Sequence, residues 1–134
     1  LKDGGSAPAN LVLFGTQETN RVLARWAGQL PLALKTNAPE AKDYGLLFIA
    51  PVQDKYALVS SGLAWWVGGE QAERARFRWQ WMSLPYRLLL SFGDFVLFKG
   101  SITNVVVEGR FDSQWKVRPA EAAQLRATGV VEVR

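Results

Sequence analysis

The sequence predicts a single α/β domain, a three-layer sandwich built around a mixed central sheet. Its 134 residues are 49% hydrophobic and 21% charged, which suits a folded core at the commonest domain size. Short apolar runs typical of buried strands alternate with stretches of helical composition. Two pairs of strands are separated by links too short for a crossover helix, so part of the sheet must be antiparallel. We expect one domain over residues 10–134, after a Gly/Ala/Pro/Ser-rich linker at 1–9.

The first expected unit is a strand followed by a helix. Residues 10–15 (NLVLFG) form an uninterrupted apolar run that ends in glycine, which is typical of a buried parallel strand. Thr16 is a candidate N-cap for a helix over 17–27, and Gly28 ends that helix. Pro119 and Gly129 bracket a second helix in the same way, over residues 119–126.

The other expected elements follow from short apolar runs and the turns between them. In chain order they are a short strand at 30–34, a hairpin of 45–50 with 56–60, a short helix at 70–77, an extended segment at 77–81, a hairpin of 94–99 with 104–111, and an edge strand at 130–133.

The sequence contains neither cysteine nor histidine. These absences exclude a Ser-His-Asp or Cys-His arrangement within the sequence, together with disulfides and cysteine-ligated metals. No serine stands in a G-x-S-x-G setting, and no spacing of carboxylates resembles a calcium loop. We therefore expect a chain that is not an enzyme on its own, with no metal site and no cofactor.

A turn after the first strand is the candidate ligand site. Gly15, Thr16, Thr19 and Asn20 lie where the carboxyl edge of an open α/β sheet would present them. The turn lacks the glycine spacing of a nucleotide-binding loop, so a binding module here would take carbohydrate or a small anion. A tight turn with a helix cap explains the same residues without any ligand.

Tryptophan is abundant, and four of the six tryptophans suggest an interface: Trp65, Trp66, Trp79 and Trp81. Residues 73–87 interleave aromatic side chains with arginines, a pattern that suits single-stranded nucleic acid or a sugar-binding platform. The simpler interpretation is an amphipathic strand whose tryptophans face the core or a neighbouring domain. We expect an interface of this kind and no nucleic-acid partner, although the net charge is +4. The longest apolar run, 46–52, is far short of the ~20 residues that span a bilayer, so no membrane span is expected.

Three segments resemble the C-terminal, non-catalytic α/β module of bacterial α/β-hydrolase proteins of the prolyl-oligopeptidase and esterase types. They are NLVLFGTQETNRVLARWAGQLPL (10–32), LLFIAPVQDKYALVSSG (46–62) and DFVLFKGSITNVVVEGRFDSQWKV (94–117), about half of the chain. Where relatives typically have Gly-Asp-Pro, this chain has Gly15, Thr16 and Gln17. In such proteins the catalytic triad lies upstream, so no active-site residue is carried over.

The resemblance implies a flavodoxin-like fold and a secreted or periplasmic bacterial protein. It implies that this chain, which begins at Leu1 rather than Met, is an accessory or interface domain of a larger serine hydrolase. The expected partner is the upstream hydrolase domain of the same polypeptide, with a homodimer as the other arrangement. The alternative function is a stand-alone binding module for carbohydrate or a small anionic ligand.

Overall fold

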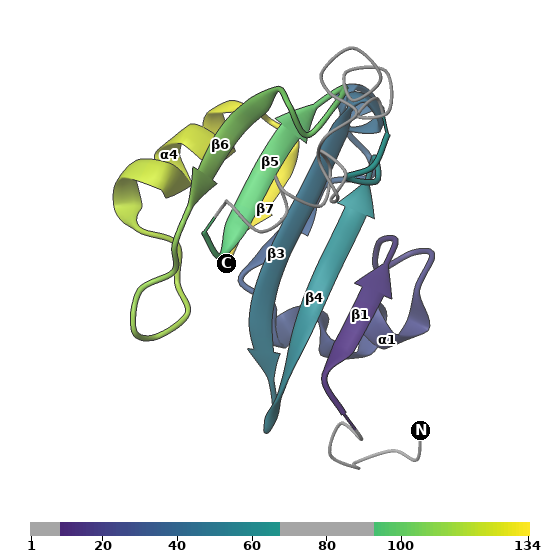
Figure 1. Ribbon diagram of the computed structural model, residues 1–134, viewed down its shortest axis with the longest axis vertical. Helices are drawn as coiled ribbons and strands as arrows, with labels where there is room; N and C mark the ends of the chain where they lie inside the picture. Colours follow the sequence, from purple (N-terminus) through teal and green to yellow (C-terminus); the bar gives the residue numbers. More distant parts are fainter. Residues whose placement is uncertain (1–8, 68–92) are drawn as a thin grey trace, which may run out of the picture.

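The computed structural model describes residues 9–67 and 93–134, which form a five-stranded sheet, a two-stranded sheet and short helices (Figure 1). The larger sheet has the strand order β1-β4-β3-β5-β6, and the smaller pairs β2 with β7. In chain order the elements are β1 (Leu11–Phe14), α1 (Arg21–Trp26), the 3-10 helix η1 (Ala27–Gln29), β2 (Leu32–Leu34), the 3-10 helix η2 (Pro39–Asp43), β3 (Tyr44–Val52), β4 (Lys55–Gly62), β5 (Phe95–Lys99), β6 (Val105–Gly109), α4 (Pro119–Ala127) and β7 (Val131–Val133).

The larger sheet is mixed, which confirms the predicted α/β class. β1 runs parallel to β4, while β3 pairs antiparallel with β4 on one side and with β5 on the other. The predicted hairpins are both present, as β3–β4 and β5–β6. The first hairpin turns over only Gln53 and Asp54, so its strands are longer than the sequence predicted. The final strand pairs with β2 rather than with the larger sheet.

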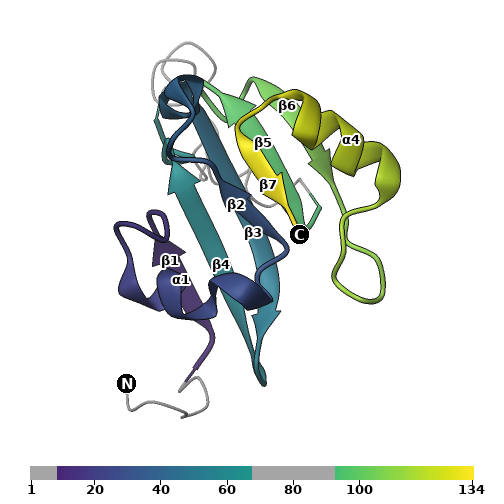
Figure 2. The ribbon, with the colours of Figure 1, turned by 180° about the vertical axis from the view of Figure 1, so that it is seen from behind.

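One face of the larger sheet carries the main core. Figure 2 shows α1, β2 and β7 in front of this face. Since side chains alternate along a strand, every second residue of β3, β4 and β5 points into this core. The buried side chains include Leu46, Phe48, Val59, Phe95 and Leu97 from the sheet, packed against Leu23, Trp26, Leu32, Leu34 and Leu125.

The opposite face carries a smaller cluster of Leu47, Trp65, Val96, Phe98 and Ile102. Beyond this cluster the face stays apolar but becomes exposed, at Val12 and Phe14 of β1. Both helices of the described residues belong to the main core, through Leu23, Trp26 and Leu125.

The first helix begins later than the sequence predicted. Its N-cap is Asn20, whose side-chain oxygen accepts hydrogen bonds from the backbone N–H groups of Val22 (2.9 Å) and Leu23 (3.3 Å). The Asn20 amide also donates to the carbonyl oxygen of Phe14, at 2.9 Å, which fixes the helix to the end of β1. The prediction of Thr16 as the N-cap is therefore wrong. The second helix, α4, has proline at its start as predicted.

Two predicted elements, the short helix at 70–77 and the extended segment at 77–81, lie outside the described residues, as do Trp79 and Trp81.

Gly45 tests how tightly β3 packs against the second cluster. An added Cβ at this buried position would overlap the Phe98 ring and the Leu63 carbonyl oxygen. Gly45→Ala is expected to lower the free energy of unfolding by about 1–3 kcal/mol, the usual cost of overpacking. Gly28→Ala is the matched control, because no atom lies within 4 Å of its added Cβ. Urea denaturation of both variants gives the comparison, and an equal effect at the two positions would contradict the packing described here.

Candidate functional site

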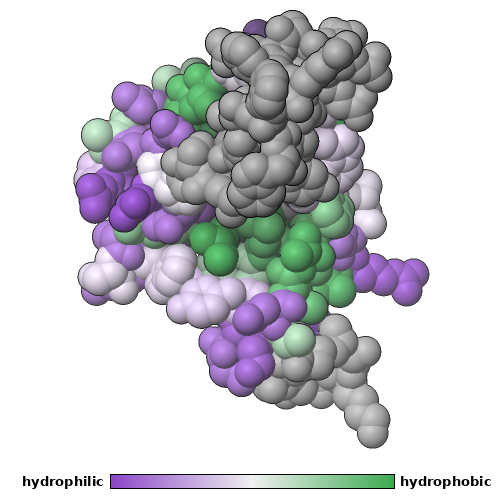
Figure 3. All heavy atoms as spheres, in the orientation of Figure 1, coloured by the Kyte–Doolittle hydropathy of each residue, from purple (hydrophilic) through white to green (hydrophobic). Residues whose placement is uncertain are grey.

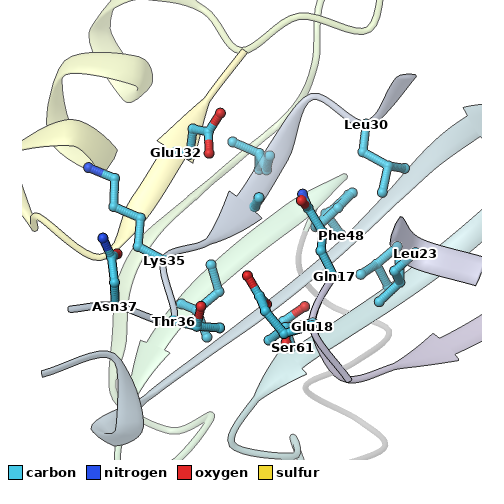
Figure 4. Close-up of a pocket in the computed structure, with 15 residues that line it drawn as sticks. Gln17, Glu18, Leu23, Leu30, Lys35, Thr36, Asn37, Phe48, Ser61 and Glu132 are labelled. Carbon is cyan, nitrogen blue, oxygen red and sulfur yellow. The ribbon is translucent and has the colours of Figure 1, made fainter. Parts of the chain in front are cut away.

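A cavity of about 310 Å³ lies between the β1–α1 turn and the loop that follows β2 (Figure 4). Its floor is formed by buried side chains of the main core, among them Leu30, Phe48 and Val59. Its rim is polar and comes from four parts of the chain: Thr16, Gln17 and Glu18; Lys35, Thr36 and Asn37; Ser61; and Glu132. An apolar floor with a polar rim is the usual composition of a small-molecule site.

The turn that forms one wall is held by hydrogen bonds to β4. Gly15 has φ +104°, a conformation that glycine adopts readily and other residues rarely do. Its N–H donates to the carbonyl oxygen of Ser60 at 2.9 Å, and its own carbonyl oxygen accepts from the Ser61 hydroxyl at 2.7 Å. Within the turn, the N–H of Thr16 donates to the Thr19 hydroxyl oxygen at 2.8 Å. The wall is therefore preorganised. The Ser61 hydroxyl hydrogen is engaged by a carbonyl group rather than by a base.

The opposite wall is held by the smaller sheet. The N–H of Lys35 donates to the carbonyl oxygen of Val130 at 2.7 Å, which continues the pairing of β2 with β7. The Arg134 guanidinium reaches back to the carbonyl oxygens of Ala27 and Leu30. Contacts between residues 27–35 and the C-terminal residues 130–134 thus hold the backbone of Lys35 in place.

The rim charges differ in how they are compensated. The Glu132 carboxylate forms an ion pair with Arg134, at 3.1 Å. Hydrogen bonding from the Thr16 side chain, then from the backbone N–H of Glu18 and from Thr36, holds the pKa of the Glu18 carboxyl below its ordinary value. Within residues 9–67 and 93–134, Lys35 forms no ion pair. The rim therefore keeps one uncompensated cation and one ionised carboxylate.

The predicted ligand-binding residues take two different roles. Thr16 lines the cavity, as a ligand-binding residue would. Thr19 and Asn20 are engaged by hydrogen bonds inside the turn and in the helix cap, and Gly15 supplies the turn conformation. No sequence pattern connects this turn with Lys35 or Glu132, because the pairing of β2 with β7 brings them to the cavity.

A second hollow, of about 290 Å³, adjoins the cavity. The two share the lining residues Thr16, Leu34 and Thr36. The rest of the second hollow is mostly apolar and lies under η2, near Pro39 and Ala41.

The second candidate surface is an aromatic cluster of Phe14, Trp65 and Trp66 on the opposite face of the larger sheet. The Phe14 ring stacks on Trp65 with centroids 5.9 Å apart and meets Trp66 edge-on at 6.0 Å, while the two tryptophans lie 4.7 Å apart. Trp65 is buried, but Phe14 and Trp66 are 49% and 44% exposed. Figure 3 shows apolar surface gathered on this face. Two of the four predicted interface tryptophans therefore lie together.

The described part of the chain gives no sign of a metal centre or a membrane helix. Residues 9–67 and 93–134 contain no group of three or more metal-ligating side chains. No helix among them has the length and apolar character needed to cross a bilayer. Comparisons with protein-family models, curated proteins and solved structures found no match for this chain.

The pKa of the Glu18 carboxyl tests the hydrogen bonding at the rim of the cavity. Because hydrogen bonds favour its ionised form, its pKa is expected below the ordinary glutamate value, and the small stability that these bonds contribute is lost as the pH falls through that lowered pKa. Thr16→Val removes the first of these donors and should return the pKa of Glu18 toward the ordinary value. Carbon-13 NMR titration of the Glu18 carboxyl measures its pKa in the parent protein and in the variant. Thr103→Val, in the β5–β6 turn, serves as the control and should leave the Glu18 titration unchanged.

Proposed function

We propose that this chain is a non-catalytic accessory domain that docks onto a larger serine hydrolase domain, of the peptidase or esterase type, in the same polypeptide. The observation that carries the proposal is the half-exposed aromatic cluster of Phe14, Trp65 and Trp66.

The cluster has the properties of an interface anchor. Its three rings contact one another and rest on the buried second cluster through Trp65, so little conformational entropy would be lost on binding. Tryptophan is enriched among the residues that contribute most to interface affinity, and phenylalanine is enriched at interfaces generally. Val12, two residues before Phe14 on the same face of β1, and Val67, the residue after Trp66, are exposed as well. A contiguous patch of this kind is typical of a protein–protein contact.

The position of β1 adds to this argument. Among the described strands, β1 lies at an edge of the larger sheet and pairs with β4 alone. An apolar edge strand favours contact with another chain or domain unless it is covered. The predicted three-layer, flavodoxin-like arrangement needs a further layer on this second face, and we expect the partner to supply part of it.

The hydrolase partner is supported by the resemblance of residues 10–32, 46–62 and 94–117 to modules that follow bacterial hydrolase domains. A sequence without histidine has no Ser-His-Asp triad of its own, so the catalytic groups would come from the upstream domain. A secreted or periplasmic location accompanies the same proposal. A homodimer through the aromatic cluster is the competing arrangement.

A module for carbohydrate or a small anion would use the cavity instead. Glu18 on its rim disfavours an anion with several charges, and the described residues of the rim include no aromatic ring on which a sugar could stack. The docking function therefore has the stronger support.

The size of the native polypeptide tests the proposal directly. An immunoblot against this domain, combined with peptide mapping, is expected to detect a chain several times larger than 14.9 kDa with hydrolase peptides upstream. A native chain of about the size of this domain would overturn the proposal.

Substitutions in the cluster test the docking face. In the full-length polypeptide, Phe14→Ser together with Trp66→Ser should weaken the contact between the two domains at least tenfold, because each removes an aromatic anchor. Limited proteolysis measures the weakened contact, because the interdomain linker is then cleaved faster. Val105→Ser is the matched control, since Val105 is also exposed but lies on β6 at the other edge of the sheet. Equal cleavage of the two variants and the parent would count against this face.

A further inference from the structure

We infer that the cavity beside the β1–α1 turn binds a small zwitterion with an apolar side chain, the chemistry of a free hydrophobic α-amino acid. The inference does not rest on the docking function. The cavity opens on the main-core face of the sheet, above Phe48 and Val59, whereas Phe14 and Trp66 belong to the opposite face.

The charges on the rim favour a ligand with one positive and one negative group. Lys35 has no carboxylate partner in the described part of the chain, and Glu18 is kept ionised by its hydrogen bonds. Glu132 is neutralised by Arg134. A carboxylate is therefore attracted to Lys35 and an ammonium group to Glu18, while a polyanion is repelled by Glu18 and a simple cation by Lys35.

The arrangement of the neutral polar groups agrees with this assignment. Figure 4 shows Lys35 and Asn37 on one side of the cavity and Gln17 and Glu18 on the other. The side-chain amides of Gln17 and Asn37 form no hydrogen bond with the described residues. Each side-chain amide has N–H donors and an oxygen acceptor. The Asn37 amide can therefore donate to the carboxylate of the ligand, and the Gln17 amide can accept from its ammonium group.

The floor determines the side chain of the ligand. It is formed by aliphatic and aromatic groups of the core, including Leu30, Phe48 and Val59. A volume of about 310 Å³ is near the lower end of small-molecule sites, which suits an amino acid better than a nucleotide or an oligosaccharide. Each buried methylene should strengthen binding about fourfold, so leucine is expected to bind at least tenfold more tightly than alanine.

The first experiment is a titration of the protein with L-leucine, followed by backbone amide NMR shifts and by calorimetry. L-Alanine, 4-methylpentanoate, 3-methylbutylamine and inorganic phosphate are the comparison probes. The two singly charged analogues keep the apolar body of leucine and lack one charge each. We expect leucine to shift the amides of Thr16, Gln17 and Thr36, and each analogue to bind at least tenfold more weakly.

Substitutions then assign the two charges. Lys35→Met should weaken the binding of leucine and 4-methylpentanoate at least tenfold but leave that of 3-methylbutylamine unchanged. Glu18→Gln should show the converse selectivity. Lys116→Met and Glu108→Gln are the matched controls, because both residues are exposed and neither lines the cavity. Circular dichroism confirms that each variant is folded.

Three outcomes would overturn the inference. One is the absence of any leucine-dependent shift at millimolar concentration in the folded protein. Another is binding of either singly charged analogue, or of phosphate, as tight as that of leucine. The third is binding of leucine that is unchanged by Lys35→Met and Glu18→Gln. None of these results bears on domain docking, and a failure of docking through Phe14 and Trp66 would leave the cavity untouched.

Discussion

The parallel pairing of β1 with β4 is the constraint on which both candidate surfaces depend. In this register Leu13 lies beside Val59 and points into the main core, while Phe14 lies beside Ser60 and points to the opposite face. The hydrogen bond from Gly15 to Ser60 ends the pairing and turns the chain toward α1. Since a shift of one residue would reverse every side chain of a strand, the same pairing places the aromatic cluster on one face and the cavity wall on the other.

The two faces of the larger sheet differ in chemistry because different elements cover them. On the first face, α1 and the β2–β7 pair bury the core but do not meet completely, and the space left between them is the cavity. Most of its polar rim comes from the β1–α1 turn and the loop after β2, and Glu132 of β7 completes it. On the second face, the buried cluster around Leu47 and Phe98 lies beside exposed aromatic rings. The first arrangement suits a small ligand and the second suits a protein surface.

Long-range contacts complete the cavity. Thr16 and Glu132 are far apart in the chain, yet both line it, because β2 follows α1 directly and β7 pairs with β2. Arg134 strengthens this link by donating to the carbonyl oxygens of Ala27, the first residue of η1, and Leu30, the residue that follows η1. The charge that Arg134 neutralises on Glu132 is part of the reason why Lys35 and Glu18 dominate the rim.

The sequence by itself determined the α/β class, both hairpins, the opening strand and the proline-started α4, because each has a local signal: an apolar run, a short link or a cap residue. It also predicted a turn at Gly15, which is present, and an interface at Trp65 and Trp66, which stays a prediction. It misplaced the cap of α1, since Thr16 and Asn20 are both good N-cap residues and only the hydrogen bond from Asn20 to the end of β1 distinguishes them. Only the tertiary structure decided that Phe14 joins the tryptophans and that Lys35 and Glu18 line one cavity. Strand pairing and register set these contacts between distant residues, and no local pattern of amino acids encodes them.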